Sequence, residues 1–144
     1  MKKTARNTAL NLLARREHGV EELTQKLLDK DFDAGEVDSA IKKLCSEGLL
    51  SDERFIESYC RSRSNKGFGP LAIKNELRLK KLNEGIIEQV INQLDIDWFS
   101  ILEELFHKKY YKSDLNDMKK KAKCWRFLSQ RGFSSDQINR IINR

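Results

Sequence analysis

Basic side chains at helical spacing are the residues of this sequence that are best placed to do chemistry. Lys74, Arg78 and Lys81 are spaced i, i+4 and i+7, which puts them on one face of a helix. Arg54 and Arg61 are seven residues apart and share a face of the preceding helix. Rows of this kind can contact phosphates or the carboxylates of a partner. The alternative is an ordinary solvated helix surface.

Positive charge is concentrated in two segments of the chain. Residues 54–81 hold eight basic and two acidic side chains, and residues 108–131 hold nine basic and two acidic ones. The whole chain carries a formal net charge of +6, which favours an acidic partner or nucleic acid. We predict that the first cluster is functional, and that the lysine run 119–121 is a solvated surface.

No pattern of catalytic residues is present in the sequence. A Walker loop, an HExxH sequence and a GxSxG sequence are all missing. We expect His18 and His107 to lie at the surface or at an edge, without a catalytic role. The turn KGFGP (66–70) is too short to bind phosphates as a Walker loop does, so we expect a helix junction with Phe68 exposed. The protein is therefore predicted to be no enzyme and to need no cofactor or metal.

The three cysteines, Cys45, Cys60 and Cys124, are odd in number and far apart, with no CxxC pair. Neither histidine lies at zinc-ligand spacing from a cysteine, so we expect three buried structural thiols. No apolar run reaches about 18 residues, which predicts no membrane span. The apolar part of the N-terminus is interrupted at Asn11 and is too short for a signal peptide, so we expect a cytoplasmic protein.

The elements that must position these residues repeat along the chain. A shift of 50 residues brings the apolar positions of the first copy onto those of the second, and a shift of 51 brings the second onto the third. The aligned positions are Leu23, Leu27, Phe32, Val37, Ile41 and Leu44; then Ile73, Leu77, Leu82, Ile87, Ile91 and Leu94; then Leu128, Phe133, Ile138 and Ile142. A constant apolar register at this period indicates a repeat architecture. We predict repeats over 1–50, 51–96 and 97–144.

Each repeat has the pattern of three short helices. Apolar residues recur at i, i+4, i+7 and i+8 over 4–17, and similar stripes predict helices over about 34–47, 83–95 and 118–131. Thr4, Asp33 and Ser51 are candidate N-caps. With one proline and seven glycines, a turn-rich β fold is disfavoured. The fold predicted is all-α and elongated, with about nine helices in three helix-turn-helix-like repeats.

Two classes of function fit tandem three-helix units. The first is a helix-turn-helix DNA-binding protein such as a transcriptional regulator, in which the last helix of each unit enters the major groove. That reading is disfavoured because the helix at 83–95 carries Glu84, Glu88 and Asp95 and no basic residue. The second is an elongated module that binds a repetitive partner through several weak contacts.

Three segments resemble the RecX family of bacterial recombination regulators. They are LLSDERF (49–55), YCRSRSNKGFGPLAIKNEL (59–77) and RFLSQRGFSSDQINRII (126–142). The resemblance implies a non-enzymatic protein of tandem three-helix repeats. It also implies binding to RecA and to the RecA filament on single-stranded DNA, with inhibition of recombinase, ATPase and coprotease activities. The expected DNA binding is weak and non-specific, and we expect a monomer.

The resemblance also implies roles for individual residues. The residues that match the family's central motif are Tyr59, Arg61, Arg63, Lys66, Gly67, Gly69, Pro70 and Glu76. Tyr59 and the basic members are expected to contact the filament, together with Arg54, Lys74, Arg78 and Lys81 from the charge pattern. Gly67, Gly69 and Pro70 are expected to set the helix junction, and Gly132 the turn in the last segment. The connection 111–117 has no glycine and departs from the family pattern.

Overall fold

The computed structural model describes residues 3–143, and every regular element in that range is a helix. The first repeat contains α1 (Ala5–Arg15), α2 (Val20–Asp29) and α3 (Ala34–Ser46). The second contains α4 (Asp52–Asn65), α5 (Pro70–Leu79) and α6 (Glu84–Leu94). The third contains α7 (Trp98–Tyr110), α8 (Met118–Gln130) and α9 (Ser135–Ile142). The prediction of nine helices in three tandem units is confirmed for the described residues.

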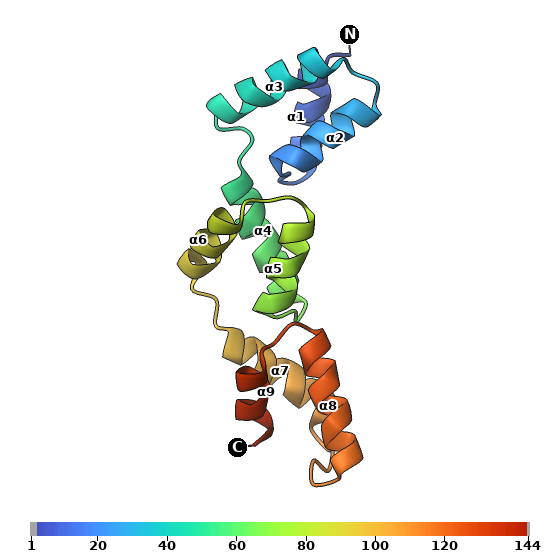
Figure 1. Cartoon of the computed structure of the whole chain (residues 1–144), viewed down its shortest axis with the longest axis vertical. Helices are drawn as coiled ribbons and strands as arrows, with labels where there is room; N and C mark the ends of the chain where they lie inside the picture. Colours follow the sequence, from blue (N-terminus) through green and yellow to red (C-terminus); the bar gives the residue numbers. More distant parts are fainter. Residues whose placement is uncertain (1–2, 144) are drawn as a thin grey trace.

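The three units stack end to end and make an elongated molecule (Figure 1). The second helices α2, α5 and α8 follow one another down one side, and α3, α6 and α9 lie toward the other. Each unit has a separate apolar core, centred on Leu23 and Leu27, on Ile73 and Leu77, and on Cys124 and Leu128. These are the positions that the repeat register predicts to be buried. A helix of 8–14 residues is marginal alone, so packing within each unit stabilises it.

Side chains cap most of the helices. Thr4, Asp33 and Ser51 accept hydrogen bonds from the first backbone N–H groups of α1, α3 and α4, as predicted. The helices α2 and α5 differ, since Gly19 and Gly69 precede them and provide no side-chain cap. Their N-termini are therefore satisfied in another way.

The next repeat caps the second helix of the repeat before it. The carboxylate Oδ1 of Asp52 on α4 accepts a hydrogen bond of 2.8 Å from the backbone N–H of Val20 at the start of α2. The carbonyl oxygen of Gly132, in the turn between α8 and α9, accepts one of 3.0 Å from the N–H of Leu71 on α5. The remaining second helix, α8, has a cap of its own in Asp117. The connection 111–117 ends at Asp117. Because the side chain of Asp117 caps α8, this connection does not need a glycine junction.

The junction between the second and third repeats is a close contact of two backbones. The N–H of Gly69 donates to the carbonyl of Arg131 at 2.7 Å. A Cβ atom added to Gly69 would lie 2.5 Å from the carbonyl oxygen of Gly132, and one added to Gly132 would lie 2.4 Å from the Cβ of Ala72. Gly132 also has a positive φ of 99°. Only glycine fits at either position.

His18 lies at the junction between the first and second repeats and is buried, which corrects the prediction of a surface position. Its side chain is 2% exposed. Its Nδ1 lies 3.0 Å from the carbonyl oxygen of Arg16 and its Nε2 lies 3.1 Å from Lys26 Nζ. Because an ammonium group only donates, Nε2 accepts and Nδ1 carries the proton. Burial lowers the pKa of His18, and the nearby charges of Arg16 and Lys26 lower it further, against the opposing effects of the hydrogen bond to the Arg16 carbonyl and of the charge of Glu22.

We expect His18 to make the free energy of unfolding depend on pH below about 6.5. Its folded-state pKa lies below the unfolded value, so the unfolded chain takes up the proton first as the pH falls. Stability should therefore decrease from about pH 6.5 down to the lower pKa of the folded state. Urea denaturation at several pH values would measure this. His18→Gln should remove the slope in that window, whereas parallel pH profiles for the two proteins would contradict the assignment.

Candidate partner-binding surface

The residues predicted to bind a partner lie on α4, on α5 and in the turns that follow these helices. Arg54, Tyr59, Arg61 and Arg63 are on α4, and Lys66 is its C-cap. Lys74 and Arg78 are on α5, and Lys81 follows it with a positive φ of 64°. Pro70 is the first residue of α5, where its missing N–H costs nothing, and Gly67 has a φ of 88°. The 66–70 segment is a helix junction, as predicted.

Glu76 organises the centre of this surface. Its Oε1 accepts hydrogen bonds from Tyr59 Oη at 2.5 Å and from Arg63 Nε at 2.9 Å, and its Oε2 accepts one from Arg63 Nη2 at 3.2 Å. Burial, and then the hydrogen bond to Glu76, raise the pKa of Tyr59 to about 12. All three side chains are half-buried between α4 and α5. The network fixes these two helices against each other, so Tyr59 and Arg63 are held in place by the protein's own contacts.

Phe68 is half-buried, which corrects the prediction that it is exposed. The guanidinium carbon of Arg63 lies 3.7 Å from the centre of its ring, and that of Arg131 lies 4.7 Å from it. Arg131 Nη1 also donates to the carbonyl oxygen of Lys66 at 3.1 Å. Cations over an aromatic ring are attracted to its face. Phe68 therefore joins the second repeat to the third, a role that sequence patterns could not indicate because Arg131 is far away in the chain.

Most of the predicted basic contacts already have a carboxylate partner. Five of the seven basic residues form ion pairs: Arg54 with Glu17, Arg61 with Glu57, Arg63 with Glu76, Lys74 with Glu88, and Arg78 with Glu84. The pairs of Arg61 and Arg78 are largely exposed, and such pairs contribute little to stability. These two cations can exchange their partner for another carboxylate or a phosphate at small cost. The pair of Arg54 spans two repeats, and so helps to position them.

Two exposed leucines on α5 belong to this surface and were not predicted. Leu71 is 52% exposed and Leu79 is 76% exposed. They lie on the side of α5 opposite to the core residues Ile73 and Leu77. Their helical spacing from Ile73 and Leu77, which excludes them from the core face, was the signal in the sequence that could have identified them. Leu79 lines a notch of about 330 Å³ between α5 and α2, with Glu21, Glu22, Lys80 and Lys81 around it. Exposed apolar side chains within a charged surface are suited to a protein partner.

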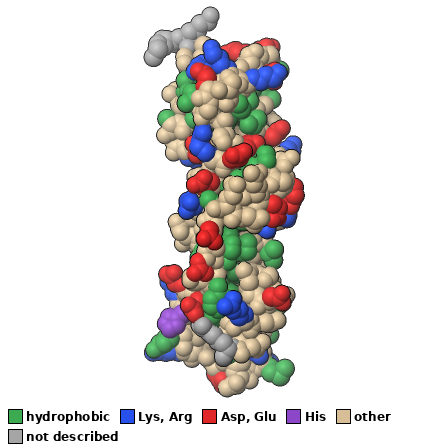
Figure 2. Space-filling view, turned by 90° about the vertical axis from the view of Figure 1, so that its left-hand side faces the viewer, with side chains coloured by type: hydrophobic (Ala, Val, Ile, Leu, Met, Phe, Trp, Pro, Cys, Tyr) green, Lys and Arg blue, Asp and Glu red, His purple; other side chains and the backbone are tan. Residues whose placement is uncertain are grey.

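The face formed by the third helices lacks a basic row. Figure 2 shows the side on which α3, α6 and α9 lie, where acidic side chains recur along the length with basic ones scattered among them. On α6 the carboxylates of Glu84 and Glu88 pair with Arg78 and Lys74 of α5. A helix with this charge would be repelled by phosphates in a DNA groove. The geometry therefore does not support the alternative hypothesis of a helix-turn-helix DNA-binding protein.

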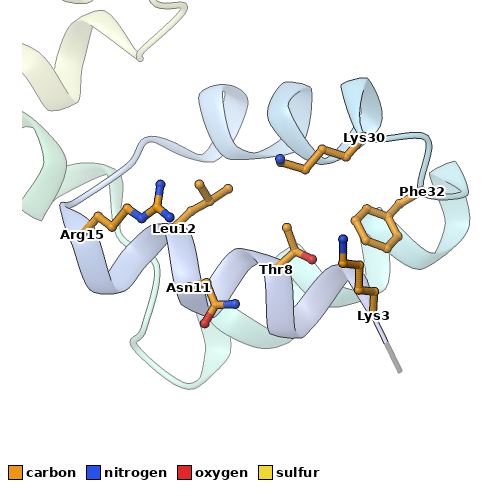
Figure 3. A pocket seen from close by; sticks show the side chains of 7 residues that line it. All are labelled: Lys3, Thr8, Asn11, Leu12, Arg15, Lys30 and Phe32. Atoms are coloured by element: carbon orange, nitrogen blue, oxygen red, sulfur yellow. The ribbon is translucent and has the colours of Figure 1, made fainter. Parts of the chain in front are cut away.

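A further hollow lies in the first repeat, away from these residues. It has a volume of about 330 Å³, with Leu12 and Phe32 as its apolar side and Arg15, Lys30 and Lys3 around it (Figure 3). No carboxylate, histidine or cysteine lines it. In the second repeat the residue equivalent to Lys30 is Lys80, whose Nζ lies 5.6 Å from the ring centre of Tyr59. The described residues that line the hollow are basic, neutral polar or apolar.

The sequence also predicted three buried thiols and no membrane span. Cys60 and Cys124 are buried, as predicted, but Cys45 is exposed near the end of α3. Burial raises the pKa of Cys60 and of Cys124 to about 11, so both stay protonated at neutral pH. Among residues 3–143, no cluster of three or more potential metal ligands is found. In the same range, none of the helices has the length and apolar character needed to cross a membrane.

These features define an all-α tandem-repeat protein whose middle repeat has a mixed charged and apolar surface. Family models of the first, second and third three-helix domains of RecX match residues 5–44, 51–91 and 95–142. The chain belongs to the RecX family.

Individual relatives cover nearly the whole chain. It is 41% identical over 138 residues to regulatory protein RecX of Pseudomonas entomophila strain L48. The match covers 96% of this chain and 89% of the relative. It is 42% identical over 137 residues to regulatory protein RecX of Ectopseudomonas mendocina strain ymp, over 95% of this chain and 91% of the relative. The crystal structure of RecX from Lactobacillus salivarius has a TM-score of 0.76 and 28% identity, with 96% of this chain and 92% of that one covered.

Proposed function

We propose that this protein binds the RecA recombinase and its filament on single-stranded DNA, and restrains recombination, ATP hydrolysis and coprotease activity. Membership of the RecX family, whose relatives are named regulatory proteins, is the observation that carries the proposal. The elongated stack of three similar units supports it, because a filament offers a repeating series of sites. Weak contacts from successive units then reinforce one another through effective concentration.

The middle repeat is the part that we assign to RecA. Leu71 and Leu79 supply exposed apolar area, and its burial against a partner is favourable. Arg61 and Arg78 can give up their exposed ion pairs for acidic groups of the partner, and Lys66 and Lys81 have no described ion pair to give up. Arg63, Lys74 and Tyr59 hold the surface in shape. Docking across neighbouring RecA subunits would then block the addition of further subunits.

We expect Leu79→Asp to weaken inhibition of RecA by about tenfold or more, because a buried charge replaces an interface anchor. The measurement is the single-strand-dependent ATP hydrolysis of RecA while this protein is titrated below the RecA concentration. The parent should inhibit at substoichiometric ratios, because a few blocked positions affect many subunits.

The matched control for Leu79→Asp is Leu49→Asp. Leu49 is 43% exposed and lies between α3 and α4, away from the proposed surface. It should inhibit like the parent, and circular dichroism should show equal helix content in all three proteins. If Leu79→Asp inhibits RecA as strongly as Leu49→Asp does, Leu79 is not part of the contact. No inhibition by the parent would overturn the proposed function.

A further inference from the structure

The outer face of α8 carries a group of cations that the proposed RecA surface does not include. Lys119, Lys120, Lys121, Lys123 and Arg126 are all exposed, and α8 contains no acidic residue. None of the five forms an ion pair with a carboxylate in the part of the chain that the structure describes. The lysine run was expected to be an ordinary solvated surface, but its setting differs from that of the middle repeat, where most cations are paired.

The apolar residues of the two surfaces also differ. The outer face of α5 presents Leu71 and Leu79, whereas on α8 the exposed residues other than the cations are small or polar, apart from Met118 at its first position. The centre of a contact between two proteins is depleted in lysine, which is the main exposed residue type on α8. A phosphate backbone needs only unpaired cations. Charge complementarity therefore favours a polyanion over a second protein at α8.

The arrangement of these cations suits a single strand. Lys119, Lys123 and Arg126 are spaced i, i+4 and i+7 on one face and extend over about 10 Å of helix. Beside them, Tyr110 and Phe127 line an open groove of about 530 Å³, together with Lys109 of α7, Lys123, Arg126 and Gln130. Lys109 Nζ lies 3.6 Å from the ring centre of Phe127. Aromatic side chains in a positively charged groove are the combination that binds single strands without sequence preference.

We propose that the α7–α8 face of the third repeat is a binding surface for single-stranded nucleic acid. Phosphates would lie along Lys119, Lys123 and Arg126, and a base entering the groove would displace Lys109, whose Nζ lies over the Phe127 ring. The surface is separate from the middle-repeat residues assigned to RecA, and its function does not require RecA. The third repeat would hold the nucleic acid while the second contacts the protein.

The test is the binding of a fluorescently labelled thymidine oligonucleotide to the full chain without RecA, followed by anisotropy over a range of salt concentrations. The variant carries Lys119→Gln, Lys123→Gln and Arg126→Gln, all at exposed positions and with a side chain that favours helix. Its affinity at low salt should fall tenfold or more. The slope of log affinity against log salt should decrease by about 2, since each lost phosphate contact removes about 0.7. An unchanged affinity and slope would overturn the proposal.

A second variant, Arg6→Gln with Arg16→Gln and Lys42→Gln, has the same change in net charge but loses only paired cations of the first repeat, outside the proposed RecA surface. It should bind the oligonucleotide like the parent. An equal loss in this control would show diffuse attraction to the net charge, and would overturn the assignment to α8. Unlabelled duplex should compete poorly, and competition as strong as that of the single strand would also contradict the proposal. Because RecA is absent, these outcomes are independent of the proposed regulatory function.

Discussion

Gly132→Ala is expected to lower the free energy of unfolding by about 2–5 kcal/mol. The new methyl group would lie 2.4 Å from the Cβ and 2.5 Å from the backbone nitrogen of Ala72, so the two repeats would have to move apart. The φ of 99° adds backbone strain. Separation would also lengthen the two backbone hydrogen bonds that join Gly69 and Leu71 to the turn at 131–132. Urea denaturation measures the first effect, and hydrogen exchange of the Gly69 and Leu71 amides measures the second.

Gly48→Ala is the matched control for this experiment. Gly48 also has a positive φ, of 74°, but no atom lies within 4 Å of an added Cβ. Gly48→Ala should lower the free energy of unfolding only by the backbone strain, about 1–2 kcal/mol. The difference between the two variants is then the energy of the contact between repeats. If both cost the same, and the two amides keep their protection in Gly132→Ala, the close approach of Gly132 to Ala72 contributes nothing to the coupling of the second and third repeats.

Leu77→Ala is expected to cost about 2–5 kcal/mol, because Leu77 is fully buried and its truncation leaves a cavity. The core of the second repeat contains only eight buried residues, so little remains to close around the gap. Such a loss is a large part of the free energy of unfolding of a whole domain, which is typically about 5–15 kcal/mol. The denaturant midpoint and the circular dichroism signal would report it, and α4, α5 and α6 should unfold first.

Leu79→Ala separates the effect of burial from the effect of removing a leucine from α5. The residue is on the same helix, two positions away, and is 76% exposed. It should change stability by no more than about 0.5 kcal/mol. Comparable costs for the two substitutions would mean that the register of α5 is rotated from the one described.

The repeat register was readable from the sequence because helical period and burial are local properties of the pattern. Leu27, Leu77 and Leu128 align at the two shifts, and all three are fully buried. The caps at Asp33 and Ser51 were also predictable, since an N-cap depends only on residues within one turn. Cys45 was predicted wrongly, because burial was inferred from residue type. Leu44 occupies the core position, and Cys45 lies one residue further around the helix, where it is exposed.

The surface could be predicted only as a list of charges. Sequence spacing placed Lys74 and Arg78 on one face of a helix, but their partners Glu88 and Glu84 come from the next helix. The contact of His18 with Lys26 likewise depends on how the chain turns from α1 into α2. The number of cations on α8 could be read from the sequence. Their lack of carboxylate partners in the described chain could not be predicted from it. Ion pairing depends on distances between helices, which a one-dimensional pattern does not contain.

By itself, the sequence determined that this protein is an all-α stack of three similar units, because the apolar period and the turn residues act over a few residues. Tertiary structure alone decided how the units are joined and which charges are available to a partner. Asp52 caps α2, Gly132 caps α5, and Arg131 reaches Phe68, each across a boundary between repeats. These contacts join residues more than 30 positions apart, and only the packed arrangement of the helices brings such residues within bonding distance.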